Sequence, residues 1–195
     1  MNRRDFLTLT ASSALLLPKF IQSAYAETGA PPLKEQKDYL SVTHTVTFNG
    51  RRSDVRRALF TPEGGVLNFV EPTPSIPGIH GFQPILGAFP EQGAVRKVIL
   101  TDGNAVTERV VRNNQDVFEY QIWDLTAKNG WAVDHIRGRF DYKAVSNEKT
   151  VVTWEYAIAP SSFVAKPFIK RFLKRDFQPF LTSGLEGAAR NFNTK

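Results

Sequence analysis

Alternation of apolar and polar residues is the clearest pattern in the chain. From Tyr39 to Asn49, apolar side chains alternate with serine and threonine. A period of two places the two sets on opposite faces of an extended strand. The apolar face also carries His44, which we interpret as a core histidine with hydrogen-bond partners rather than as a ligand. We therefore predict a first strand over residues 39–49.

Three central strands are predicted over residues 95–101, 105–112 and 117–126. These runs are rich in β-branched and aromatic residues, which favour strands. Asp102-Gly103 separates the first two runs, and Asp-Gly between apolar runs is typical of a β-hairpin. A polar run separates the second from the third. The pattern therefore predicts three consecutive antiparallel strands.

Two charged residues, Arg96 and Glu108, interrupt these apolar runs. A charge that points into a core is costly unless it is paired or solvated. A three-residue turn over 102–104 would place Arg96 diagonally across from Glu108, whereas a two-residue turn would place Lys97 opposite Glu108. The sequence leaves this register open. It also leaves open whether the pair is structural or orients a polar group of a ligand.

Two further strands are predicted over residues 131–145 and 150–159, and both are sharply two-faced. One face of the first strand carries His135, on the side opposite its aromatic residues. This pattern indicates an antiparallel sheet with one covered side. The residues predicted to face that side are Ile136, Gly138, Phe140, Tyr142, Val152, Trp154, Tyr156 and Ile158.

Residues 163–193 are predicted to be helical, because apolar residues recur there at spacings of three, four and seven. Pro167 suits a first helical turn, whereas Pro179 is expected to kink or divide the helix near residue 178. The opposite face is basic. We interpret it as a solvated face, with contact to anionic lipid or an acidic partner as the alternative. Its residues are Lys166, Lys170, Arg171, Lys174 and Arg175.

The segment between the first strand and the central strands is less regular. Residues 53–60 predict a short helix capped by Ser53. Residues 61–93 contain six prolines and one weak strand near 82–88. A long loop of this kind is either functional or structural filler, and the sequence favours neither.

The order of elements predicts an α+β fold: a curved antiparallel sheet of about six or seven strands wrapped around a long C-terminal helix. One helix cannot fill the whole concave face, so a pocket is expected between them. The length of 195 residues is typical of one domain. Fifteen phenylalanines supply apolar volume for a core or a pocket lining.

Composition argues against several kinds of site. The chain has no cysteine and only three histidines, far apart in sequence, so neither a metal site nor a cofactor is expected. The net charge is +6, and removing residues 1–26 takes away three of the 25 basic and one of the 19 acidic residues, leaving +4. This mild, dispersed charge does not indicate nucleic-acid binding.

Residues 1–26 resemble a twin-arginine export signal. Arg3-Arg4 precede a polar residue, Phe and Leu, then a moderately apolar run, and Ala24-Tyr25-Ala26 supplies a small-x-small cleavage pattern. The resemblance implies export by the twin-arginine machinery to the periplasm and cleavage after Ala26. Residues 27–38 are interpreted as a linker, and residues 39–193 as the folded domain.

The central strands carry a family resemblance. Gly93, Arg96 and Val98, then Gly103 and Glu108-Arg109, are similar to the signature of the START-like helix-grip superfamily (SRPBCC). This superfamily includes birch-pollen-type allergens, polyketide cyclases and aromatases, and lipid-transfer domains. The resemblance implies that Glu108 faces a ligand cavity.

The ligand-binding residues expected from this resemblance and from the alternation are Arg96, Val98, Val106, Glu108, Val110, Phe118, Tyr120, Ile122, Phe140, Trp154, Tyr156 and Phe172. Three functions compete. The first is binding or carrying a hydrophobic or amphipathic small molecule, such as a lipid or an aromatic compound. The second is a cyclase, aromatase or dehydrase reaction with Glu108 and Tyr120 as candidate catalytic residues; His135 is weaker because it falls on the other face. The third is an envelope interaction through the basic helix face, with possible contact to a membrane surface.

Overall fold

The computed structural model describes residues 29–194. The predicted export signal over residues 1–26 lies outside the described residues. All strands and helices named below belong to the unit that begins at Pro31. Within the described range, no helix has both the length and the apolar character needed to cross a bilayer.

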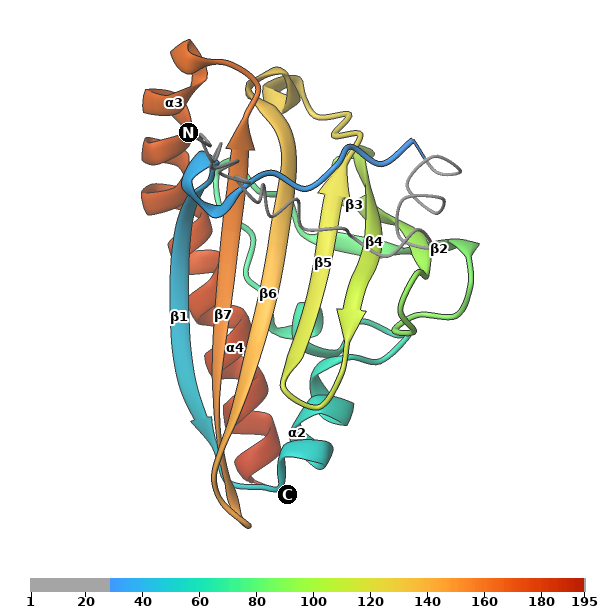
Figure 1. Ribbon diagram of the computed structural model, residues 1–195, viewed down its shortest axis with the longest axis vertical. Helices are drawn as coiled ribbons and strands as arrows, with labels where there is room; N and C mark the ends of the chain where they lie inside the picture. Colours follow the sequence, from blue (N-terminus) through green and yellow to red (C-terminus); the bar gives the residue numbers. More distant parts are fainter. Residues whose placement is uncertain (1–28, 195) are drawn as a thin grey trace, which may run out of the picture. The chain divides into compact units, whose positions relative to one another are not determined.

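Seven antiparallel strands form one curved sheet in the order β1-β7-β6-β5-β4-β3-β2 (Figure 1). This confirms the predicted sheet, with the weak strand near 82–88 now placed at 79–86. The strands are β1 (Leu40–Phe48), β2 (Ile79–Leu86), β3 (Val95–Leu100), β4 (Ala105–Asn113), β5 (Val117–Trp123), β6 (Val133–Ser146) and β7 (Lys149–Pro160).

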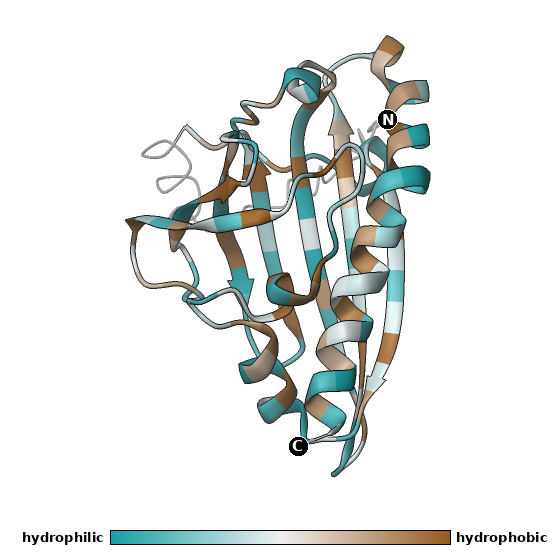
Figure 2. Ribbon diagram, turned by 180° about the vertical axis from the view of Figure 1, so that it is seen from behind, coloured by the Kyte–Doolittle hydropathy of each residue, from teal (hydrophilic) through white to brown (hydrophobic). Residues whose placement is uncertain are grey.

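A helical segment of four consecutive elements covers the concave face of the sheet, as Figure 2 shows from behind. Pro179 lies in the first turn of α4, directly after a π-helical turn. A proline lacks a backbone N–H and its ring crowds the preceding turn, so the wider π-turn takes the place of the kink predicted near residue 178. The elements are η4 (Phe163–Ala165), α3 (Lys166–Phe172), η5 (Leu173–Phe177) and α4 (Gln178–Asn193).

The short helix α2 (Arg52–Leu59) and the 3-10 turn η2 (Gly65–Phe69) close one end of this face. The residue at the N-cap of α2 is Arg51, without a side-chain cap hydrogen bond, so the predicted cap at Ser53 is wrong by two residues. Directly after α2, the ring of Phe60 stacks on Phe118 at 3.7 Å between centroids. The sheet is therefore tightly covered at this end.

The β3–β4 hairpin settles the register that the sequence left open. Arg96 lies directly opposite Glu108, so neither predicted register is observed. The Leu100 N–H donates to the Asn104 carbonyl at 2.8 Å, so the turn between the last paired residues is 101–103 instead of the expected 102–104. Its glycine takes a positive φ of 84°, and the Asp102 carboxylate accepts the backbone N–H of Asn104 at 3.0 Å. Glycine and an Asx turn both stabilise this turn at a position one residue earlier than expected.

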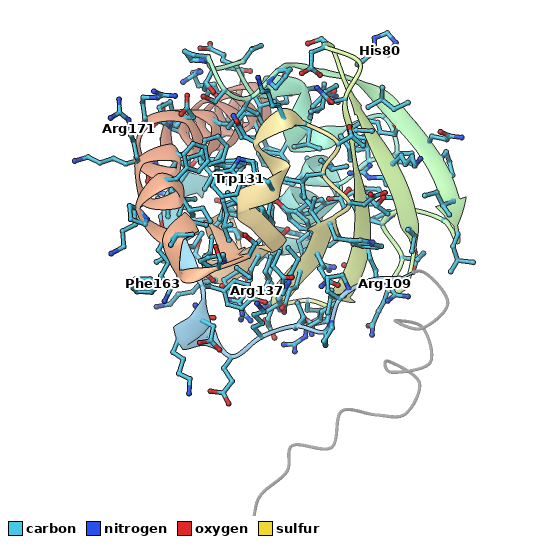
Figure 3. All side chains as sticks on the ribbon, turned by 90° about the horizontal axis from the view of Figure 1, so that it is seen from above. His80, Arg109, Trp131, Arg137, Phe163 and Arg171 are labelled. Atoms are coloured by element: carbon cyan, nitrogen blue, oxygen red, sulfur yellow. The ribbon has the colours of Figure 1, made fainter. Side chains whose placement is uncertain are left out.

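The convex face of the sheet is partly covered as well, whereas the sequence indicated one covered side. Residues 31–39, mostly within the predicted linker, form a structured segment with the 3-10 turn η1 (Gln36–Asp38). The amide nitrogen of Gln36 donates a hydrogen bond to Glu155 at 3.2 Å. The amide oxygen of Gln36 accepts one from Arg137, which is labelled in Figure 3. Tyr39 packs against small residues of β7. This segment thus belongs to the fold.

His135 is fully buried beneath this segment. Its Nε2 lies 2.7 Å from the Tyr39 hydroxyl, and its Nδ1 lies 2.9 Å from the Asp134 carboxylate. Burial lowers the pKa of His135, and this effect outweighs the opposite influence of Asp134. His44, on the other face, is only partly buried, which differs from the expected core position. Its Nδ1 lies 3.5 Å from the Thr182 hydroxyl, and its Nε2 lies 3.3 Å from Glu186 Oε1 without a hydrogen bond.

Candidate ligand cavity

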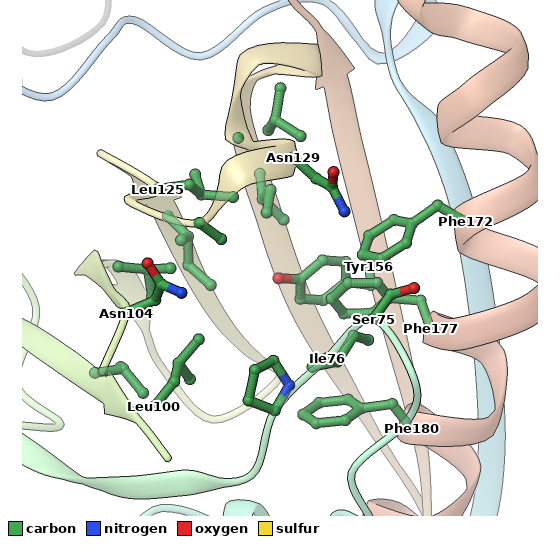
Figure 4. A pocket seen from close by; sticks show the side chains of 18 of the residues that line it. Ser75, Ile76, Leu100, Asn104, Leu125, Asn129, Tyr156, Phe172, Phe177 and Phe180 are labelled. Carbon is green, nitrogen blue, oxygen red and sulfur yellow. The ribbon is translucent and has the colours of Figure 1, made fainter. Parts of the chain in front are cut away.

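A cavity of about 380 Å³ lies between the sheet, the helical segment and two loops (Figure 4). The loops are residues 74–77 and 127–130. The strand residues on its wall are Ile79, Val98, Leu100, Val106, Glu108, Tyr120, Ile122, Val133, Ile136, Trp154 and Tyr156, and the helical ones are Phe168, Ile169, Phe172, Phe177 and Phe180. Most of these side chains are apolar, so the wall is suited to an apolar ligand.

Glu108 is the one strand carboxylate on this wall among the described residues. Its Oε2 accepts the Nε–H of Arg96 at 2.5 Å, and the two residues are only 5% and 4% exposed. The Arg96 guanidinium lies 3.4 Å from the ring centroid of Phe89 and 4.2 Å from that of Phe82. Cation–π contact and the carboxylate together stabilise the buried charge. The pair therefore joins β3 to β4, with Glu108 on the cavity wall.

Two buried tyrosines add hydrogen-bonding groups. Trp154 donates its indole N–H to the Tyr120 hydroxyl at 3.1 Å. Burial raises the pKa of Tyr120 strongly, with Glu108 adding to the effect, and burial likewise raises the pKa of Tyr156. Both phenols stay protonated at neutral pH. The Tyr120 hydroxyl accepts from Trp154, and no described residue accepts its own proton, so the hydroxyl can donate to a ligand.

Gly138 makes room for the Tyr120 ring. The two residues are paired across β5 and β6. A Cβ atom at position 138 would lie 1.9 Å from Cζ of Tyr120, far inside contact distance. The glycine that the alternation pattern placed on the inward face therefore positions a polar group of the cavity.

The cavity opens at the end formed by the 3-10 turn η3 (Lys128–Ala132), α3 and the β3–β4 loop. Lys128, Asn129, Asp102 and Phe168 all lie on the wall and are exposed to solvent, so they form its rim. Hydrogen bonds from Asn104 lower the pKa of Asp102, which stays ionised at this rim. In Figure 4 the Asn129 amide points toward the interior. The mouth is thus polar, while the interior is apolar.

Most of the ligand-binding residues expected from the sequence lie on this wall: Val98, Val106, Glu108, Tyr120, Ile122, Trp154, Tyr156 and Phe172. Arg96 and Phe140 instead border an adjoining space of about 20 Å³ that also touches Glu108. Val110 and Phe118 line neither space and are buried in the core, so their expected place on the wall is wrong. The ring of Phe118 stacks on Phe60, and no strand pattern reveals this contact. That any of these residues binds a ligand stays a prediction.

Several wall residues were not singled out as site residues. Phe177 and Phe180 belong to the helical segment, where the apolar stripe indicated only burial. Ser75 and Ile76 lie on a loop and Asn129 in the short turn η3, and such segments give no periodic pattern that places them over a sheet. The proline-rich segment was the only signal for the first loop. It now proves to form part of the wall.

No protein-family model matches the sequence, and the search of curated proteins found no match. Solved structures are similar in architecture. A major latex-like protein from Panax ginseng aligns at 15% identity and a TM-score of 0.57, over 79% of this chain and 97% of that one. The Zhui aromatase/cyclase from a Streptomyces species aligns at 16% identity and a TM-score of 0.55, over 78% of this chain and 95% of that one. The di-domain aromatase/cyclase StfQ of steffimycin biosynthesis aligns at 14% identity and a TM-score of 0.58, over 82% of this chain and 52% of that one. At such identities the similarity shows a shared fold.

Proposed function

Because the chain has the helix-grip fold of the START-like proteins, we propose that it binds or carries one hydrophobic or amphipathic small molecule, such as a lipid or an aromatic compound. One observation carries this proposal: an apolar cavity of about 380 Å³ into which Glu108, Tyr120 and Tyr156 converge. Ligand sites are usually apolar hollows of about 300–1,000 Å³ with a few placed polar groups.

The polar groups restrict the chemistry of the ligand. Glu108 on β4 offers an acceptor and Tyr120 on the neighbouring β5 offers a donor, on a wall that is mostly apolar. A hydroxyl or phenol both donates and accepts, so it matches this pair. An anionic head would meet the Glu108 carboxylate, whose charge is already balanced by Arg96. We therefore expect an uncharged polar end at Glu108 and an apolar body against Phe172 and Phe177.

The volume restricts the size of the ligand. A cavity of about 380 Å³ lies at the lower end of the usual range for ligand sites. This favours a compact molecule, such as a single-chain lipid or a small aromatic ring system, over a lipid with two long chains.

Native mass spectrometry of protein purified from the producing cells tests this proposal. We expect an additional mass that organic extraction removes, from a compound with an apolar body and a hydroxyl. Glu108→Gln should weaken binding of naphthol more than binding of methylnaphthalene, since only naphthol hydrogen-bonds the carboxylate. Protein without any such compound, and without saturable uptake of either probe, would contradict the proposal.

A cyclase- or dehydrase-type reaction is the second candidate, because a protonated phenol and a carboxylate line the same cavity. An acid and a base within reach of one substrate can catalyse proton transfer. Turnover of a poly-β-ketone substrate should then be lost in Glu108→Gln/Tyr120→Phe. It should be kept in Tyr142→Phe, which alters a buried tyrosine outside the cavity. Turnover that survives the double substitution removes this candidate.

We also propose that the protein acts in the periplasm after twin-arginine export, on the strength of Arg3-Arg4 and the apolar run that follows. Arg3→Lys/Arg4→Lys should retain the protein in the cytoplasmic fraction. Arg51→Lys/Arg57→Lys, at two exposed arginines of the folded domain, should leave export unchanged. Equal export of both variants would refute this route.

A further inference from the structure

Large apolar side chains are exposed at the end of the molecule where the cavity opens. Phe163 is 81% exposed, Val164 74%, Trp131 62% and Phe168 39%. Figure 3 views this end directly, with Trp131 and Phe163 labelled. The ring centroids of Trp131 and Phe168 are 6.0 Å apart, so η3 and α3 contribute to one patch. We call these four residues the rim patch. An exposed apolar patch of this kind marks an interaction surface.

Exposed cations lie on the same elements as the rim patch and on the neighbouring η5. The exposed residues Lys128, Lys166, Lys170, Arg171 and Lys174 lie on η3 and along α3 and η5. None of them forms an ion pair among the described residues. The Lys166 ammonium lies 5.7 Å from the ring centroid of Phe163, so a charge and an aromatic ring are presented together. Of the acids near the mouth, Asp134 is already engaged by Lys34 and His135, and the ionised Asp102 on the rim accepts hydrogen bonds from Asn104.

The rim patch is continuous with the cavity. Phe168 belongs to both, since it is exposed on the outside and lines the cavity on the inside. Lys128 is likewise both one of these exposed cations and a residue of the cavity rim. Whatever covers the rim patch therefore also covers the mouth. A partner that delivers or accepts an apolar ligand would need this placement.

We propose that the rim patch docks on an anionic phospholipid bilayer, so that an apolar ligand passes between bilayer and cavity without crossing water. Aromatic side chains are favoured at the headgroup level of a bilayer, and lysine or arginine beside them is attracted to anionic lipids. The rim patch presents exposed aromatic side chains next to cations that form no ion pair within the described residues, so it meets both requirements. This inference rests on the proposed ligand-binding function.

Quenching of Trp131 fluorescence by brominated lipid tests the docking on the full chain. The other two tryptophans, Trp123 and Trp154, are only 7% and 1% exposed, and residues 1–26 contain none. Vesicles of phosphatidylethanolamine and brominated phosphatidylglycerol should therefore quench mainly Trp131. Trp131→Phe should abolish the vesicle-dependent change, and added salt should weaken it. No quenching of the unaltered protein would overturn the proposal.

Matched variants separate the rim patch from general stickiness. Phe163→Ser/Val164→Ser and Lys170→Glu/Lys174→Glu should each raise the vesicle concentration needed for half-quenching by at least about tenfold. Ile85→Ser/Leu86→Ser removes exposed apolar residues from β2, and Lys143→Glu/Lys149→Glu reverses exposed cations of β6 and β7. Both controls should dock normally. Equal losses in the controls, or burial of Trp131 between two copies of the chain without vesicles, would refute docking on lipid.

A second readout distinguishes failure of docking from failure of the cavity. Binding of aminoanthracene in vesicle-free solution should be unchanged in Phe163→Ser/Val164→Ser, because neither residue lines the cavity. Binding of the probe without Trp131 quenching refutes docking and spares the proposed function. Quenching without probe binding supports a lipid-docking surface and refutes the ligand cavity, and with it the transfer role.

Discussion

The two ends of the concave face are built from the same strands but differ in how they are filled. At the α2 end, Phe118 and Phe140 are almost completely buried and Phe60 closes over both, with centroid distances of 3.7 and 4.9 Å. At the η3 end, Val106 and Ile122 face a cavity of about 380 Å³. Alternation along a strand selects which residues face inward. It does not determine whether anything packs against them.

What covers the sheet makes the difference. At the filled end, the chain after α2 brings Phe60 directly onto β5 and β6. At the hollow end, the covering elements are α3, η5 and the loops 74–77 and 127–130, whose side chains form a wall around a space instead of filling it. Between the two ends, Glu108 borders both the cavity and the adjoining small space, whereas Arg96 borders only the small space. The fold thus separates a tightly packed region from a region with a cavity.

Truncating one phenylalanine at each end should give the largest contrast. Phe118→Ala removes a buried ring that stacks on Phe60, so the free energy of unfolding should fall by about 3–5 kcal/mol. Phe172→Ala enlarges an existing cavity at a partly exposed position and should cost about half as much. Urea denaturation measures both. Equal losses would show that the hollow end is packed as tightly as the filled one.

Breaking the Arg96–Glu108 pair tests the boundary between the two ends. Glu108→Gln leaves the Arg96 charge buried between Phe89 and Phe82, and removing one partner of a buried pair costs about 3 kcal/mol or more. Glu108→Gln/Arg96→Met removes both charges and should recover most of this loss. Urea denaturation of the two variants checks the pair. If the double variant is the less stable one, the pair contributes more than mutual neutralisation.

Adding volume should be harmful at one end only. Val110→Phe overpacks the filled end and should cost about 1–3 kcal/mol. Val106→Phe places its ring in the cavity, so the unfolding free energy should change by less than about 1 kcal/mol. Ligand uptake should be lost in Val106→Phe. A stability loss in Val106→Phe as large as that of Val110→Phe would mean that no usable space exists.

The smallest effect on stability is expected from His135, which lies on the convex face of the sheet behind the cavity. Burial lowers the pKa of His135, with Lys34 and Arg137 acting in the same direction and Asp134 against them. Below the ordinary histidine pKa of about 6.5, the unfolded chain binds a proton that the folded protein does not. Stability should therefore fall by about 1 kcal/mol as the pH drops roughly one unit below that value.

His135→Gln provides the control for this pH effect. The variant should show a flatter dependence of unfolding free energy on pH, measured by urea denaturation, while aminoanthracene binding stays the same. Identical slopes for both proteins would assign the pH dependence to other groups. Altered probe binding would show that the two faces of the sheet are coupled.

The sequence predicts the strands and their inward residues well, because a period of two follows directly from backbone geometry. Ile136, Phe140 and Trp154 are all buried on the expected side. It predicts the hairpin register less well. The expected turn over 102–104 would pair Val98 with Glu108 instead of Val106, and such a shift by two positions keeps all three residues on the same face, so the alternation does not exclude it. Contacts between distant segments leave no local pattern at all.

Three features depend on such contacts. The segment 31–39 reads as a charged, proline-containing linker, yet Gln36 and Tyr39 reach β7 and β6 across more than ninety residues of sequence. The position of Phe60 against Phe118 filled one end of the predicted cavity. The loops 74–77 and 127–130 complete the wall of the cavity at the other end of the sheet. Each follows from tertiary packing, which single-strand periodicity does not encode.

Fluorescence titration with aminoanthracene, an uncharged aromatic amine, tests the central claim most directly. The unaltered protein should bind the probe saturably at one site, Val106→Phe should lose this binding while remaining folded, and Leu86→Phe on the exposed part of β2 should retain it. Binding that is absent from the unaltered protein, or equal in Val106→Phe, would contradict a ligand cavity at the hollow end of the sheet.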